Sequence, residues 1–246
     1  DNNILLSDVS LRFATQGVAM VHNLICGSFT SVGGGTTWRY TPYHIPHRTE
    51  VMGFMTILHG DNRFYNNIFV QKWPTKEQIT LDDQDAQNTF RENREVGTHV
   101  FDEYPSYDEW IAQFDFTQRP NMRALEPVHF GHLPIWSEGN VYLNGAKPWK
   151  KEAANLVVEN TSDLKVELVE KDGEYYLDTN IYDYLKDFGS RMINTEILGK
   201  AFEPEQYFED TDGTPIRFDA DYFGNHRGVH VIPGPFAAAA DNIKVN

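Results

Sequence analysis

Six side chains that can bind a polar ligand lie close together in the first quarter of the chain. They supply imidazole, carboxylate and guanidinium groups, and they are Arg39, His44, His47, Glu50, His59 and Asp61. Such groups hydrogen-bond hydroxyl groups, and the aromatic residues of the segment 38–43 can stack on sugar rings. We therefore expect these six residues to form part of a sugar-binding wall. The alternative is a structural loop that carries solvated charges.

The spacing His44-x-x-His47-x-x-Glu50 also places three potential metal ligands in one short segment. Pro46 lies inside this segment and disfavours a helix there. The spacing alone is a weak indication of a zinc site. We therefore predict no metal and no cofactor.

Other catalytic chemistries lack their sequence signatures. The single cysteine, Cys26, lies in the apolar run 23–26 and is predicted to be a small buried hydrophobic residue. The glycine run 33–35 lacks the lysine of a phosphate-binding loop and is interpreted as a flexible lead into the next segment. The acidic run 209–213 resembles the start of a calcium loop without its later ligands, so a turn is favoured.

Composition excludes some partners and leaves neutral ligands open. The chain has 36 Asp and Glu residues against 21 Lys and Arg residues, which gives a formal net charge of −15. A charge of this sign disfavours nucleic acid and anionic membrane surfaces as partners. No segment is long and apolar enough to span a bilayer. Localisation stays open between cytoplasmic and secreted.

A short repeat indicates the elements that must position the candidate site. An Asn residue precedes a short apolar strand four times, at Asn3, Asn23, Asn67 and, in a weaker copy, Asn140. The first interval of 20 residues fits one coil of a parallel β-helix, and longer intervals fit coils with insertions. Stacked coils would place these Asn residues above one another, with their amides bonded to backbone and to each other.

The repeat predicts an all-β protein built around a right-handed parallel β-helix, with a loop and helix insertion and a β-rich C-terminal lobe. The expected divisions are coils at 1–75 with a long loop at 29–52, an insertion at 76–134 with a short helix, a returning coil at 135–160, and a β-rich region at 161–246. Within the last region, Asp172-Gly173 and Asp212-Gly213 predict two hairpins.

The repeat register also tests for a catalytic pair. A glycosidase uses two carboxyl groups, about 5–5.5 Å apart for a retaining enzyme, and equivalent positions of neighbouring coils would lie about 4.7–4.9 Å apart. Positions equivalent to Asp8 carry Ser28, Lys72 and Gly145, and those equivalent to Asp61 carry Gly17 and Pro134. We therefore expect no stacked catalytic pair within these residues.

Several segments resemble the later coils of glycoside hydrolase family 120, which contains β-xylosidases with a parallel β-helix and a β-sandwich domain. The resemblance is carried by the segments 1–7, 14–24, 33–48 and 59–69, among them His59-Gly60-Asp61-Asn62-Arg63-Phe64-Tyr65-Asn66-Asn67. It is good over 1–73 and patchy through 150. Beyond that it rests on the strings 212–215 and 221–225.

The resemblance implies retaining hydrolysis of xylose from the non-reducing ends of xylo-oligosaccharides. Its Asp nucleophile and Glu acid/base would lie upstream of Asp1, so the chain would be the C-terminal part of the enzyme and inactive alone. We expect the N-terminal portion of the same protein, as a separate or nicked chain, to pack against residues 1–28. Two alternatives stay open, a non-catalytic carbohydrate-binding β-helix and a polysaccharide lyase.

Overall fold

The computed structural model describes residues 1–31, 40–45, 47–75, 94–117 and 131–245. The chain is strand-rich, and most of its sheets are parallel. Among the described residues no helix is long and apolar enough to cross a membrane.

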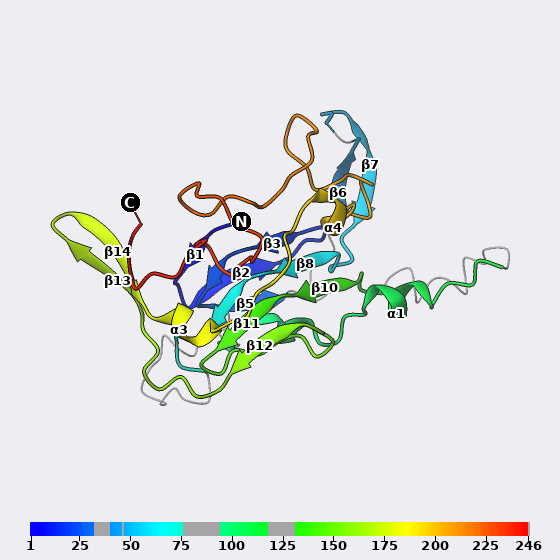
Figure 1. The fold of residues 1–246 in the computed structure, drawn as a ribbon. Coiled ribbons are helices and arrows are strands. Elements are labelled where there is room, and N and C mark those ends of the chain that lie inside the picture. Colours follow the sequence, from blue (N-terminus) through cyan, green and yellow to red (C-terminus); the bar gives the residue numbers. More distant parts are fainter. Residues whose placement is uncertain (32–39, 46, 76–93, 118–130, 246) are drawn as a thin grey trace.

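Three parallel sheets form the centre of the molecule (Figure 1). The first has the order β1 (Ile4–Leu5), β4 (Leu24–Ile25), β9 (Ile68–Val70), β11 (Asn140–Leu143) and β12 (Asn155–Val158). The second contains β3 (Ala19–Val21), β8 (Asn62–Tyr65) and β10 (Ile135–Glu138). The third contains β2 (Val9–Phe13) and β5 (Ser28–Ser31). Each copy of the sequence repeat contributes one strand to the first sheet.

The four Asn residues of the repeat form a continuous hydrogen-bonded ladder, which we call the Asn ladder. The side-chain oxygen of Asn23 accepts bonds from the backbone N–H (2.9 Å) and the amide (2.8 Å) of Asn3. Asn67 accepts the same two bonds from Asn23, and Asn140 accepts them from Asn67. The predicted stacking of these residues is therefore confirmed, and the ladder fixes the register of the sheet.

The residue before each ladder Asn has a left-handed backbone. These residues are Asn2, His22, Asn66 and Gly139, with φ between 52° and 72°. Asn, His and Gly adopt this conformation more readily than other residues do. The residue type before each ladder Asn is therefore suited to the sharp turn that the backbone makes there.

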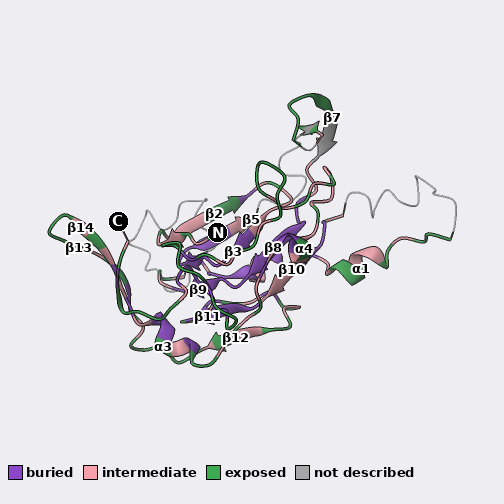
Figure 2. Cartoon of the chain, turned by 45° about the horizontal axis from the view of Figure 1, so that its top comes forward, coloured by how far each residue is buried: buried purple, intermediate pink, exposed green. Residues whose placement is uncertain are grey.

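Aromatic side chains fill the space between the sheets. Phe13 contacts Phe29 with ring centroids 5.0 Å apart, and Phe69 stacks on Tyr142 at 5.0 Å. Figure 2 shows the buried strands gathered in the middle of the molecule. Cys26 is fully buried as predicted, and burial raises the pKa of its thiol to about 12. The thiolate is therefore inaccessible at neutral pH.

The predicted long loop at 29–52 is only partly a loop. Strands β6 (Tyr40–His44) and β7 (Val51–Thr56) pair antiparallel and form a hairpin that projects from the sheets. The sequence did not indicate this because the proline-rich segment disfavours a strand, and Pro42 lies inside β6. The glycine run 33–35 lies outside the described residues.

The described part of the predicted insertion contains two short helical segments, the 3-10 helix Thr98–Phe101 and helix α1 (Tyr107–Ile111). Ser106 and Glu109 form a capping box at the start of α1. Strand β10 begins at Ile135, after the second undescribed segment. The division of the chain into domains stays a prediction.

The C-terminal region contains β13 (Val166–Lys171), β14 (Glu174–Thr179) and β15 (Asn242–Lys244) in one antiparallel sheet, with helices α3 (Ile181–Leu185) and α4 (Thr195–Leu198). The hairpin predicted at Asp172-Gly173 is present, and both turn residues have positive φ.

The second predicted hairpin, at Asp212-Gly213, is present only in part. The structure has a tight turn and one isolated bridge there, between Glu209 and Pro215. The flanking segments pair elsewhere instead, because Tyr207 bridges to Lys200 and Arg217 bridges to Asn194.

Candidate functional site

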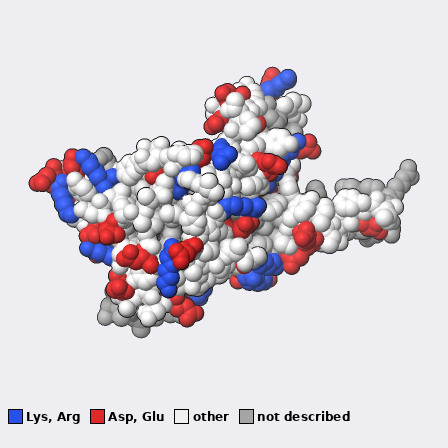
Figure 3. Space-filling view, viewed as in Figure 1, with Lys and Arg blue, Asp and Glu red and all other residues white. Residues whose placement is uncertain are grey.

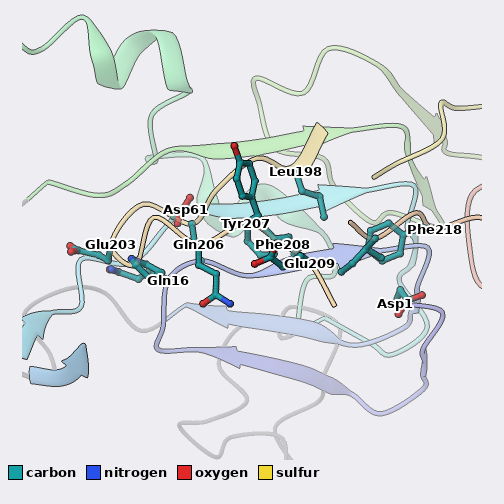
Figure 4. A pocket seen from close by; sticks show the side chains of 15 residues that line it. Asp1, Gln16, Asp61, Leu198, Glu203, Gln206, Tyr207, Phe208, Glu209 and Phe218 are labelled. Carbon is teal, nitrogen blue, oxygen red and sulfur yellow. The ribbon is translucent and has the colours of Figure 1, made fainter. Parts of the chain in front are cut away.

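A cavity of about 510 Å³ lies between the strand β3 and the segment 198–218; we call it the β3 cavity. Figure 4 shows that its lining combines side chains from the N-terminal part of the chain, such as Gln16 and Asp61, with side chains of the segment 198–218. Its lining includes Asp1, Gln16, Gly17, Ala19, Asp61, Glu203, Gln206, Tyr207, Phe208, Glu209 and Phe218. It combines carboxylates and two amides with aromatic rings, a mixture that suits a hydroxylated ligand with apolar faces.

Asp61 is the candidate residue that lines this cavity directly. Its side chain is almost fully buried and forms an ion pair with Arg63, with Oδ1 2.7 Å from Nη1. Its second oxygen accepts the backbone N–H of Phe202 at 2.9 Å. Burial raises the pKa of the Asp61 carboxyl, and the Arg63 guanidinium opposes that shift. These contacts use both carboxylate oxygens, so Asp61 shapes the cavity rather than offering a free carboxylate.

Arg63 connects β8 to the segment that covers it. Its guanidinium donates to the backbone carbonyls of Leu198 and Lys200 and to that of Asp61. It also lies between two rings, 4.3 Å from the centroid of Trp136 and 4.6 Å from that of Phe208. Arg63 therefore positions the loop that forms one wall of the β3 cavity.

His47 reaches the rim of the same cavity from the β6–β7 hairpin. Its Nε2 lies 2.7 Å from Oε1 of Glu209, which lines the cavity. The contact joins residues 162 positions apart. It therefore places the projecting hairpin next to the cavity.

Other candidate residues lie elsewhere. His44 and Glu50 are exposed on the hairpin, where His44 Nδ1 contacts the backbone oxygen of Glu50 at 3.2 Å. His59 is buried beside His132, and burial followed by the neighbouring His132 lowers the pKa of His59. Arg39 lies outside the described residues. The structure thus brings Asp61 and His47 to the β3 cavity and leaves His44, Glu50 and His59 off its lining.

No group of three metal-ligating side chains occurs within the described parts of the chain. His44 and Glu50 meet through a backbone carbonyl rather than through the Glu carboxylate.

Sequence reasoning missed the C-terminal half of the cavity. Glu203, Tyr207, Phe208, Glu209 and Phe218 all line it. The segment 207–209 had been interpreted as one strand of a hairpin, and no motif linked it to Asp61, more than 140 residues earlier. The available signal was the concentration of acidic and aromatic residues in the segment 202–210.

The charges on the drawn face of the molecule are mixed in sign. Figure 3 shows basic residues scattered among acidic ones on the face drawn. The cavity itself has four carboxylates in its lining, Asp1, Asp61, Glu203 and Glu209, and no Lys or Arg. A neutral ligand that donates hydroxyl hydrogen bonds fits such a lining better than an anion does.

One solved structure, that of XylC in complex with xylose, matches almost the whole chain. The TM-score is 0.80 and the sequence identity 28%. The match covers 99% of this chain and 35% of the XylC chain, so this chain spans about a third of the protein that it resembles. No family model matches the chain, and a search of curated proteins found no match.

Proposed function

We propose that this chain is the C-terminal part of a retaining β-xylosidase of glycoside hydrolase family 120, acting on xylo-oligosaccharides. Its parallel sheets form a right-handed parallel β-helix, and the β3 cavity is its share of the sugar site. The observation that carries the proposal is the match to xylose-bound XylC along 99% of the chain. The cavity lining of carboxylates and aromatic rings supports the same ligand class.

The repeat register indicates where the rest of the site would lie. Strand β1 pairs with β4 at an offset of 20 residues, from Ile4 to Leu24. The backbone N–H of Asn2 still donates to the carbonyl of Val21 at the end of β3. Residues preceding Asp1 in the same coil would therefore run along the outer edge of β3, directly beside the β3 cavity.

This placement gives the proposed mechanism its geometry. A carboxylate just upstream of Asp1 would enter the β3 cavity, and a second one on the preceding coil would lie about 4.7–4.9 Å away. That separation suits nucleophilic attack by one carboxylate while the other protonates the leaving oxygen. Residues of this chain bind and orient the sugar, with Tyr207 and Phe218 as apolar surfaces and Glu203 and Glu209 as hydrogen-bond acceptors.

The N-terminal portion of the same protein is accordingly the proposed partner. Strand β1 is the outermost strand of its sheet, and a parallel sheet with an open edge is suited to receive another strand. The upstream coil would add to β1 and β3 together.

Hydrolysis of an aryl β-xyloside tests the proposal. The chain would be assayed alone and again with the upstream coding region restored, and hydrolysis is expected in the longer protein only. Proton NMR of the first product should show the β anomer, as retention requires. Inversion, or a longer protein without activity on any xyloside, would contradict the proposed function.

A second candidate, a non-catalytic carbohydrate-binding protein, is favoured by one observation. Neither Asp8 nor Asp61 has a second acid at the stacked position, as the strand registers place Gly17 and Pro134 beside Asp61. Xylo-oligosaccharide binding without hydrolysis by the longer protein would support this candidate.

A further inference from the structure

A second hollow, of about 640 Å³, adjoins the β3 cavity. We call it the Trp110 hollow; it is lined by Leu58, Trp110, Phe114, Leu133, Lys200, Ala201, Phe202, Glu203 and Glu205. Ala201 and Glu203 line both depressions. The same short loop therefore separates the two, and an extended ligand could follow it from one to the other.

Aromatic rings form one side of the Trp110 hollow. The ring of Trp110 lies 5.0 Å from that of Phe202 and 4.9 Å from that of Phe114. Each of these three side chains is partly exposed. Partly exposed rings that face a hollow can stack on the C–H faces of a sugar, while its hydroxyl groups stay near water.

These rings are held by the residues that shape the β3 cavity. Phe202 contacts Trp136 edge-on at 5.8 Å, and Trp136 packs on the guanidinium of Arg63. The backbone N–H of Phe202 donates to Asp61. One packed series of side chains thus runs from the first depression to the second and fixes their spacing before any ligand binds.

Polar side chains complete the lining. Glu203 and Glu205 supply carboxylate acceptors, and Lys200 supplies a donor. The Lys200 ammonium lies 4.8 Å from the ring centroid of Tyr207, a residue of the β3 cavity. Both kinds of hydrogen-bonding group are therefore present at the boundary between the two depressions.

We propose that the Trp110 hollow is a second sugar-binding subsite, which receives the xylose units that follow the one bound in the β3 cavity. This inference rests on the proposed function, because it takes the ligand class from it. The subsite would set a preference for xylo-oligosaccharides over xylose and over short aryl xylosides. Trp110 is the main stacking surface, and Phe114 and Phe202 support it.

Isothermal titration calorimetry tests the subsite. The chain would be titrated with xylose, xylobiose, xylotriose and xylotetraose. Affinity should rise with chain length, and Trp110→Ala should reduce the affinity for xylotetraose by about tenfold while leaving that for xylose unchanged. Trp110→Phe should restore most of the loss because it keeps an aromatic face. Trp73→Ala is the matched control, since Trp73 is 37% exposed and lines neither depression. Circular dichroism and thermal melting check that each variant is folded.

The outcomes separate the subsite from the proposed function. Xylose binding with no gain from longer chains, or with a gain that Trp110→Ala leaves intact, would overturn the subsite alone. Binding of the longer sugars that depends on Trp110, without any xylose binding, would support the subsite and count against the β3 cavity as the sugar site. The absence of binding by every sugar in this series would overturn the subsite, whereas the hydrolysis assay of the longer protein decides the proposed function.

Discussion

Asp61 and Arg63 illustrate how a single residue acts in this molecule. The pair is almost fully buried and joins β8 to the segment 198–202 through side-chain and backbone bonds. The sequence indicated Asp61 as a candidate ligand contact, whereas the structure gives it two structural partners. Under the proposed function, Asp61 would act on a bound sugar only through the loop that it positions.

Replacement of Asp61 by Asn tests this structural role. The amide keeps the shape of the carboxylate but leaves the Arg63 guanidinium buried without its counter-charge. Loss of one partner of a buried pair costs about 3 kcal/mol of unfolding free energy. Urea denaturation would measure the loss, and Asp187→Asn, an exposed substitution, is the control. Equal stability of the two variants would contradict the role of Asp61.

Glu152 is a half-buried residue whose carboxyl has no cationic partner among its described contacts. Its oxygens accept bonds from Ser137 Oγ (2.7 Å), Asn140 Nδ2 (2.9 Å) and the Tyr142 hydroxyl (2.6 Å). Burial raises the pKa of Glu152 above its ordinary value of 4.5, and these hydrogen bonds oppose the shift. The folded state therefore binds the proton more tightly than the unfolded state does.

The sign of the pH dependence follows from this difference. The contribution of Glu152 to the unfolding free energy is fully present below pH 4.5 and falls as the pH rises through the folded-state pKa. Glu152→Gln stays neutral and keeps the acceptor for Asn140. Denaturation curves between about pH 4 and 8 should therefore show the variant gaining stability relative to the wild type as pH rises. A constant difference across that range would contradict the prediction.

At the scale of elements, the Asn ladder fixes how the short strands of the first sheet align. Several of these strands have only two to four residues, so few backbone bonds define their register. Each ladder amide adds bonds to the next strand at the same position of every repeat. A slip of one residue would break all of them together and would turn the apolar side chains outward.

Removal of a central rung should cost more than removal of the terminal one. Asn67→Ala leaves the buried N–H and amide of Asn23 without their acceptor, and each unsatisfied group costs about 1–3 kcal/mol. Asn3→Ala removes only the amide donor at the edge of the sheet, because the backbone N–H of residue 3 still donates to the Asn23 oxygen. Chemical denaturation of both variants would measure the difference. A lower stability of Asn3→Ala than of Asn67→Ala would contradict this role of the ladder.

At the scale of the whole molecule, the C-terminal segment returns to the first repeat and contacts Asn2, near the N-terminus (Figure 1). The Asn2 amide donates to the carbonyl of Ala220, and its oxygen accepts from Arg227 at 2.8 Å. Arg227 is 1% exposed and also donates to the carbonyls of Ile232, Gly234 and Phe236. This contact fixes the start of the first repeat, next to Asp1, which lines the β3 cavity.

Replacement of Arg227 by Lys tests this long-range connection. A lysine keeps the charge but cannot reproduce the planar set of donors that reaches four acceptors. Hydrogen exchange measured by mass spectrometry should show faster exchange in residues 1–25 and 219–237, with the hairpin β13–β14 unchanged. Arg217→Lys is the control, because Arg217 is 62% exposed. Unchanged exchange in residues 1–25 would contradict the connection.

The sequence by itself determined the repeat, the ladder, the buried Cys26 and the hairpin at Asp172-Gly173. These features depend on local turn chemistry and on a regular interval between equivalent residues. Both can be recognised in the amino-acid sequence alone. It also named Asp61 as a candidate site residue, and the strand registers of the described residues place no acid beside it.

Only the tertiary structure decided what surrounds that site. The β3 cavity forms where the segment 198–218 folds back on β3 and β8, with Tyr207 bridged to Lys200 and Glu209 bridged to Pro215. Contacts such as His47 with Glu209 and Asp61 with Phe202 join residues more than 140 positions apart. No sequence period or motif predicts such long-range contacts. They depend on which surfaces bury the most apolar area against one another once the sheets have formed.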